Sequence, residues 1–235
     1  MAGVRLDFKS QRERMVERYI RLGYLSSPRM IEAMRKVPRE LFMPEPLRRY
    51  SYYDEPYPIP GDGRQTISAP YTYPLFYEPL DLSLGDRFLE VGMGSGYGAA
   101  LARELVGGEG LVVTIEINRD TYEFGVENLR KAGYLDVIAV LGDGSKGYPE
   151  YAPYDKICVT AACPRVPQPL LEQLDRPGRL IAPIGPLSTL IGQDLTLITR
   201  DDLGKERVEK LTKVVYVPLQ GEYGWGRYEL KRSNG

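Results

Sequence analysis

The chain has 235 residues, 43% of them hydrophobic, which is enough to bury the core of one α/β domain with appended segments. Its 31 Lys and Arg residues balance 32 Asp and Glu residues, which argues against a nucleic-acid-binding surface. No apolar run approaches the length of a membrane span, and the polar N-terminus lacks the apolar stretch of a signal peptide. The two cysteines fit a reducing compartment. We therefore expect a cytoplasmic protein that binds neither nucleic acid nor a membrane.

The first 80 residues predict helices joined by irregular chain. Apolar residues at helical spacing predict a helix over residues 10–22, which ends at Gly23. Ser27 followed by Pro28 is typical of a helix start. The remaining expected segments are a helix from Pro28 to Val37, irregular chain over 38–60, a polar loop over 61–70 and a helix over 73–82.

Beyond this region, strands and helices alternate. The expected strands cover residues 87–91, 111–116, 137–141, 156–160 and 179–183, and the expected helices cover 97–106, 119–132 and 167–174. Such alternation predicts a mostly parallel sheet with helices on both faces. Two further strands, over 191–199 and 207–217, are expected to be antiparallel. We expect one domain over residues 1–235, made of N-terminal helices with a substrate and cofactor loop (1–80), a nucleoside-binding core (81–200) and a C-terminal strand and tail (201–235).

The stretch LEVGMGSGYG at residues 89–98 joins the first expected strand to a helix. Glu90 precedes Gly92 and Gly94, and a third glycine follows at the same spacing. Glycines let the backbone turn sharply and let a ligand come close to it. A dinucleotide-binding turn would place its third glycine at Tyr97, and Glu90 would repel a pyrophosphate. A carboxylate there instead suits the cationic amino-acid part of S-adenosylmethionine, and this glycine pattern is the first motif of Rossmann-like methyltransferases.

Two other expected strands also end in carboxylates. Glu116 lies about twenty residues after the glycines, where a carboxylate can accept hydrogen bonds from ribose hydroxyls. Asp143 lies between Gly142 and Gly144 and could accept a hydrogen bond from the adenine amino group. Ligands bind at the carboxyl ends of parallel strands, so these carboxylates and Glu90 together predict a nucleoside-binding site.

The chemistry of the acceptor is restricted by what the sequence lacks. Residues 160–164, Thr-Ala-Ala-Cys-Pro, offer no amide or carboxylate to hold an amine, which argues against methylation of an exocyclic amine. The chain contains no histidine, which excludes the usual general base and every Ser-His-Asp arrangement. No further ligands join Cys158 and Cys163 to form a metal site. Any catalysis must therefore proceed without an imidazole, and we expect no metal.

A series of short motifs runs in order from about residue 12 to about residue 225. The most specific is Pro58-Ile59-Pro60 followed by QTISAP at 65–70; the others are VPRELF at 37–42, LGDG at 141–144, APYD at 152–155, VTAA at 159–162 and VPL at 217–219. In these motifs the chain resembles the protein-L-isoaspartate O-methyltransferase family. The resemblance implies a Rossmann-like S-adenosylmethionine-dependent methyltransferase fold: a mostly parallel doubly wound sheet, antiparallel C-terminal strands and an N-terminal helical extension.

The same resemblance implies a repair activity and assigns residues to it. The enzyme would transfer a methyl group from S-adenosylmethionine to the free carboxylate of L-isoaspartyl residues in damaged proteins and peptides, and release S-adenosylhomocysteine. By position, Ser68 matches the active-site serine. The implied cofactor-binding residues are Gln65, Thr66 and Ile67 in the loop, Glu90, Gly92 and Gly94 at the glycine turn, Glu116 and Ile117 at the ribose, and Asp143 and Gly144 at the adenine.

Three other functions stay open from the residues alone. A methyltransferase of the same fold could act on a small-molecule carboxylate, although it would have no reason to share residues 65–70. A nicotinamide oxidoreductase is disfavoured by Glu90 and Tyr97. A non-enzymatic protein of this fold would bind the cofactor without turnover. The oligomeric state stays open as well.

Overall fold

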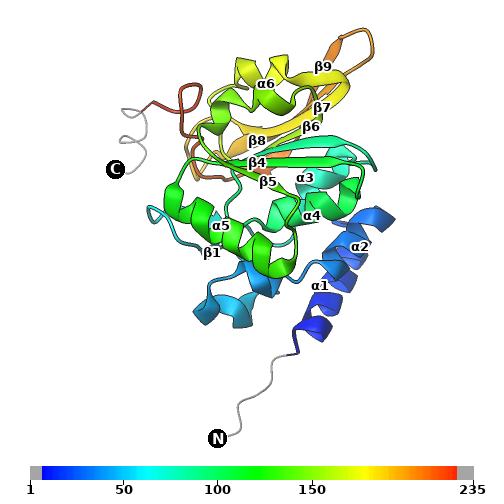
Figure 1. The fold of residues 1–235 in the computed structure, drawn as a ribbon, viewed down its shortest axis with the longest axis vertical. Helices are drawn as coiled ribbons and strands as arrows, with labels where there is room; N and C mark the ends of the chain where they lie inside the picture. Colours follow the sequence, from blue (N-terminus) through cyan, green and yellow to red (C-terminus); the bar gives the residue numbers. More distant parts are fainter. Residues whose placement is uncertain (1–6, 227–235) are drawn as a thin grey trace, which may run out of the picture.

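The computed structural model describes residues 7–226, which form a seven-stranded sheet with helices on both faces and a separate two-stranded hairpin (Figure 1). The strand order in the sheet is β5-β4-β3-β6-β7-β8-β9. These strands are β3 (Arg87–Val91), β4 (Leu111–Glu116), β5 (Ile138–Leu141), β6 (Tyr154–Val159), β7 (Leu174–Ile184), β8 (Gln193–Arg200) and β9 (Glu206–Val214). The strands from β5 to β7 pair in parallel, and β8 and β9 add to them antiparallel. The expected mostly parallel sheet with antiparallel C-terminal strands is confirmed.

The strands differ in composition because they differ in burial. β3 and β4 lie inside the sheet with helices over both faces, and most of their residues are apolar, as in buried parallel strands; their buried polar residues are Glu90, Thr114 and Glu116. β9 is an edge strand whose residues are mostly exposed, and it carries alternating basic and acidic side chains. Charges on an edge strand oppose pairing with another chain.

The helices agree with the expected ones to within a few residues. They are α1 (Phe8–Leu22), α2 (Pro28–Lys36), α3 (Thr72–Leu80), α4 (Tyr97–Val106), α5 (Arg119–Ala132) and α6 (Gln168–Glu172). Ser27 and Asn118 cap the starts of α2 and α5, and Gly23 ends α1 in the left-handed conformation that glycine adopts easily. α2 packs against α4, which places the N-terminal extension beside the core (Figure 1). No helix within residues 7–226 is long and apolar enough to cross a bilayer.

The N-terminal connection is more regular than expected. The segment expected to be irregular contains two 3₁₀ turns, Arg39–Phe42 and Glu45–Tyr50, and the strand β1 (Tyr57–Pro58). β1 pairs antiparallel with β2 (Thr66–Ile67), so the expected loop over 61–70 is partly a hairpin. Two-residue strands are too short to show an alternating pattern, which is why the sequence did not predict them.

Two strands end at other positions than expected. β7 begins at Leu174, which pairs with Tyr154 of β6, and the register between the two strands shifts before the next pair, Lys156 with Arg179. β9 was expected to reach residue 217, but it ends at Val214. The chain then leaves the sheet edge and forms backbone hydrogen bonds with Ala162, beyond the end of β6. This departure brings residues 215–220 to the carboxyl ends of the parallel strands.

Candidate active site

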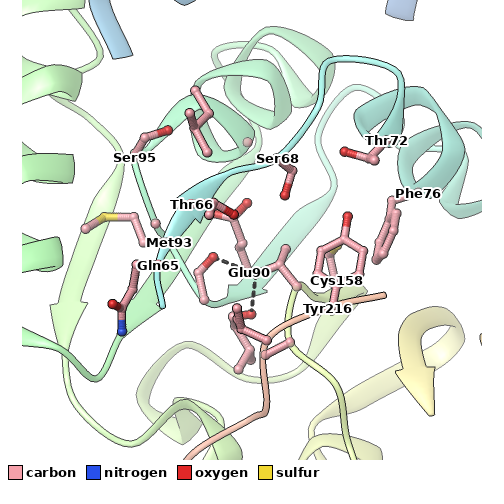
Figure 2. Close-up of a pocket in the computed structure, with 18 of the residues that line it drawn as sticks. Gln65, Thr66, Ser68, Thr72, Phe76, Glu90, Met93, Ser95, Cys158 and Tyr216 are labelled. Atoms are coloured by element: carbon pink, nitrogen blue, oxygen red, sulfur yellow. Dashed lines mark hydrogen bonds between the residues drawn. The ribbon is translucent and has the colours of Figure 1, made fainter. Parts of the chain in front are cut away.

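A cavity of about 280 Å³ lies at the carboxyl ends of the parallel strands (Figure 2). Its walls come from β2, α3, the turn after β3, the ends of β4 and β6, and residues 215–220. This is where ligands bind in parallel α/β sheets. The predicted site residues that line it are Gln65, Thr66, Ile67, Ser68, Glu90, Gly92, Gly94, Glu116, Ile117 and Gly144. Asp143 alone of the predicted set is not part of the lining.

The glycine turn after β3 depends on residues without a side chain. Gly92 and Gly94 have φ angles of 99° and 56°, a region that other residues rarely occupy. A Cβ at Gly92 would lie 2.3 Å from Thr160 Oγ1, and one at Gly98 would lie 2.2 Å from Glu90 Oε1. The turn therefore presents bare backbone to the cavity, and a side chain at Gly92 or Gly98 would collide with Thr160 or Glu90 in its wall.

Glu90 is the most buried carboxylate of the cavity, with 2% of its surface exposed. It accepts hydrogen bonds from Thr114 Oγ1 at 2.6 Å and from the Tyr77 hydroxyl at 3.2 Å. Burial, together with the negative charge of Glu116, raises the pKa of Glu90 to about 8, although the two hydroxyls oppose the shift. Both hydrogen-bond partners are neutral, so a cationic ligand would stabilise the ionised form of this carboxylate.

Glu116 ends β4 and connects it to the glycine turn. Its Oε2 accepts a hydrogen bond from the Gly94 amide, and its Oε1 accepts from the amides of Ile117 and Asn118, all at 3.0 Å. Burial raises the pKa of Glu116, and the three amides oppose this shift. The carboxylate is thus fixed in place with lone pairs to spare for a ligand hydroxyl.

Asp143 holds the C-terminal segment over the cavity. Its Oδ2 accepts from the Glu222 amide at 2.9 Å, and its Oδ1 accepts from both the amide and the hydroxyl of Ser145. A Cβ at Gly221 would lie 2.0 Å from Asp143 Oδ1, so the chain passes very close to this carboxylate. Gly144 is the member of this pair that faces the cavity, and contact between Asp143 and adenine stays a prediction.

Ser68 follows β2 and directs its hydroxyl into the cavity (Figure 2). Its carbonyl accepts a hydrogen bond at 2.7 Å from the guanidinium of Arg39, which also donates to the Ser51 carbonyl at 2.8 Å. Arg39 is fully buried, and its guanidinium lies over the rings of Tyr97 and Tyr73, 5.1 and 5.8 Å from their centroids. A buried cation therefore connects the 3₁₀ turns of the N-terminal extension to the backbone of Ser68.

Sequence reasoning missed several residues that line the cavity. They are Tyr71, Thr72, Tyr73, Phe76 and Tyr77 of the α3 region, Cys158, Thr160 and Ala161 at the end of β6, and residues 215–220. The VPL motif at 217–219 was a signal for the last group, although it carried no assigned role. Burial raises the pKa of the Cys158 thiol well above its usual value, and Glu90 adds to this, so Cys158 does not supply a thiolate nucleophile near neutral pH.

The comparisons with known proteins agree with one another. The model of the family described as protein-L-isoaspartate(D-aspartate) O-methyltransferase matches residues 10–224. Two relatives named protein-L-isoaspartate O-methyltransferase come from Hyperthermus butylicus (46% identical over 230 residues, covering 94% of this chain and 93% of the relative) and Methanopyrus kandleri (47% over 219 residues, covering 93% and 95%).

Two solved structures share the architecture. One named protein-L-isoaspartate O-methyltransferase has a TM-score of 0.79 at 33% identity and covers 91% of this chain and 67% of that chain. The other, titled as a beta-aspartate methyltransferase from Plasmodium falciparum in complex with S-adenosyl-L-homocysteine, has a TM-score of 0.77 at 25% identity and covers 92% and 99%. The chain therefore belongs to the protein-L-isoaspartate(D-aspartate) O-methyltransferase family.

Proposed function

We propose that this protein is a repair enzyme that transfers a methyl group from S-adenosylmethionine to the free carboxylate of L-isoaspartyl residues in damaged proteins and peptides. The observation that carries the proposal is the position of Ser68, which opens onto the same cavity as the glycine turn and Glu90 in a chain of this family. The following backbone nitrogen would then attack the methyl ester and expel methanol, which takes up the amide proton, to give a succinimide whose hydrolysis returns part of the material to aspartate.

The cavity fits S-adenosylmethionine by its shape and its charge. The turn at Gly92 and Gly94 exposes backbone to the cavity, Glu90 suits the ammonium group, and Glu116 suits the ribose hydroxyls. None of the described residues that line the cavity is basic, so a cation is not repelled. When bound, the cofactor supplies a methyl group on a sulfonium, whose thioether leaving group needs no acid.

The acceptor fits an enzyme without histidine. An α-carboxylate with a reference pKa of about 3.5 is already ionised at pH 7, so no base is needed. The protein contributes alignment and exclusion of water, which are large effects for reactions of this kind. The Ser68 hydroxyl can donate a hydrogen bond to one oxygen of the acceptor carboxylate and hold it in place.

The chain would act as one methyltransferase domain, because the N-terminal hairpin, the sheet and the C-terminal segment all contribute walls to one cavity. Its partners are isoaspartyl-containing proteins and peptides. We place the activity in the cytoplasm, because Cys158 and Cys163 are free thiols and such thiols are typical of a reducing compartment.

The deciding experiment offers labelled S-adenosylmethionine with two peptides that differ only in isoaspartate or aspartate at one site. We expect a base-labile methyl ester on the isoaspartyl peptide and at least about a hundredfold less on the aspartyl one, because an error of about 1 Å in alignment can lower a rate by that factor. Ser68→Ala should lower kcat and leave S-adenosylmethionine affinity unchanged.

Two outcomes would contradict the proposal. Equal methylation of both peptides would remove the isoaspartyl specificity. Methylation of small-molecule carboxylates in place of either peptide would favour the alternative enzyme of the same fold.

A further inference from the structure

Tyr216 brings a phenol hydroxyl to the proposed methyl-acceptor side of the cavity. It lies just beyond the end of β9, where its amide donates a hydrogen bond to Gln193 Oε1 at 2.9 Å. Its ring packs against Phe76 with 5.2 Å between the centroids. Its side chain lines the same cavity as Ser68 and Thr72, on the side where both of these residues lie. Figure 2 shows these side chains gathered at one side of the cavity.

Each of the three hydroxyls has one hydrogen, and this limits which side chain can donate a hydrogen bond to which acceptor. Thr72 Oγ1 donates its hydrogen to the Ala69 carbonyl at 2.7 Å, so it has none for the cavity. An ionised carboxylate accepts hydrogen bonds and donates none. Ser68 must therefore give its single hydrogen to the acceptor carboxylate, and its oxygen is then left to accept. Tyr216 can fill that position, because burial raises the pKa of its phenol and keeps it protonated.

We propose that Tyr216 is a positioning residue for the methyl acceptor: its hydroxyl donates to Ser68 Oγ and so directs the Ser68 hydrogen toward the carboxylate. Ser68 is then fixed at two points, because the buried Arg39 donates a hydrogen bond to its carbonyl. This inference rests on the proposed function, since it needs an acceptor carboxylate beside Ser68.

The variant Tyr216→Phe tests the proposal because it removes the hydroxyl and keeps the ring against Phe76. We expect kcat for the isoaspartyl peptide to fall roughly three- to tenfold, as for the loss of one neutral hydrogen bond. Calorimetry should give an unchanged dissociation constant for S-adenosylmethionine. The same method, with the enzyme saturated with S-adenosylhomocysteine, should show weaker binding of the isoaspartyl peptide.

A double-mutant cycle separates this role from a general structural one. If Tyr216 acts through Ser68, adding Tyr216→Phe to Ser68→Ala should lower kcat no further. The matched control is Tyr154→Phe, which removes a buried hydroxyl that donates to the Tyr148 carbonyl at the opposite end of β6. This control should leave kcat unchanged.

The outcomes distinguish failure of this inference from failure of the proposed function. A wild-type protein that does not prefer the isoaspartyl peptide overturns the proposed function and this inference with it. If the wild-type protein does prefer the isoaspartyl peptide, two results would overturn this inference alone. One is full kcat in Tyr216→Phe. The other is an equal loss of kcat when Tyr216→Phe is added to Ser68→Ala.

Discussion

At the scale of single residues, Glu116 has two separable tasks. Its carboxylate accepts hydrogen bonds from three backbone amides, and this fixes the glycine turn against the start of α5. The same carboxylate lines the cavity, where we propose that it accepts hydrogen bonds from ribose hydroxyls. A simple loss of affinity in a variant would not separate the two tasks, so the ligand must be varied too.

We therefore predict a difference between two ligands. Wild-type protein should bind S-adenosylhomocysteine more tightly than its 2′-deoxy analogue by about 1.5–3 kcal/mol, the size of a hydrogen bond to a charged acceptor. Glu116→Ala should bind both ligands weakly and equally, as measured by calorimetric titration. Asp120→Ala, which removes an exposed carboxylate in the first turn of α5, should keep the wild-type preference. Full preference in Glu116→Ala would contradict the ribose assignment.

At the scale of elements, Arg39 connects the N-terminal extension to the acceptor loop. Arg39→Met removes the donors to the carbonyls of Ser51 and Ser68 and leaves these groups buried without a partner. We expect a loss of about 1–3 kcal/mol in the free energy of unfolding for each unsatisfied group. We also expect kcat for the isoaspartyl peptide to fall, because the Ser68 backbone loses its anchor.

A second buried arginine provides the control for that variant. Arg103 is 8% exposed and donates to the carbonyls of Gly107 and Gly110 at the end of α4, away from the cavity. Arg103→Met should lose a similar amount of stability in urea unfolding and keep its kcat. Equal effects of the two variants on kcat would show that Arg39 acts only through overall stability.

The elements also show what could be predicted from the sequence. Long apolar runs and helix caps carry a local signal, so the mostly parallel sheet was confirmed, and most of its strands and helices lie within a few residues of the expected ranges. The end of β9 at Val214 has no such signal, because it depends on a backbone pairing with Ala162 that lies far away in the sequence. Tyr216 was missed for the same reason, since its place in the cavity follows from where the chain leaves the sheet.

At the scale of the whole molecule, the cavity buries carboxylates, and their ionisation lowers the stability of the folded protein. Burial raises the pKa of Glu90 to about 8, against about 4.5 for the unfolded chain, and raises the pKa of Glu116 as well. Between these two pH values the folded protein keeps a proton that the unfolded chain releases. The free energy of unfolding should therefore decrease as pH rises from about 4.5 to about 8 and level off above that.

We predict a slope of up to about 1.4 kcal/mol per pH unit for one proton in urea unfolding of the ligand-free protein between pH 5 and 8. Glu90→Gln keeps the size of the side chain but cannot ionise, so most of the slope should disappear. Glu109→Gln, an exposed glutamate before β4, should keep the wild-type slope. Saturating S-adenosylhomocysteine should reduce the slope in the wild-type protein, because its ammonium group stabilises ionised Glu90. If Glu90→Gln and wild type had the same slope, the pH dependence would have to come from Glu116 or from outside the cavity.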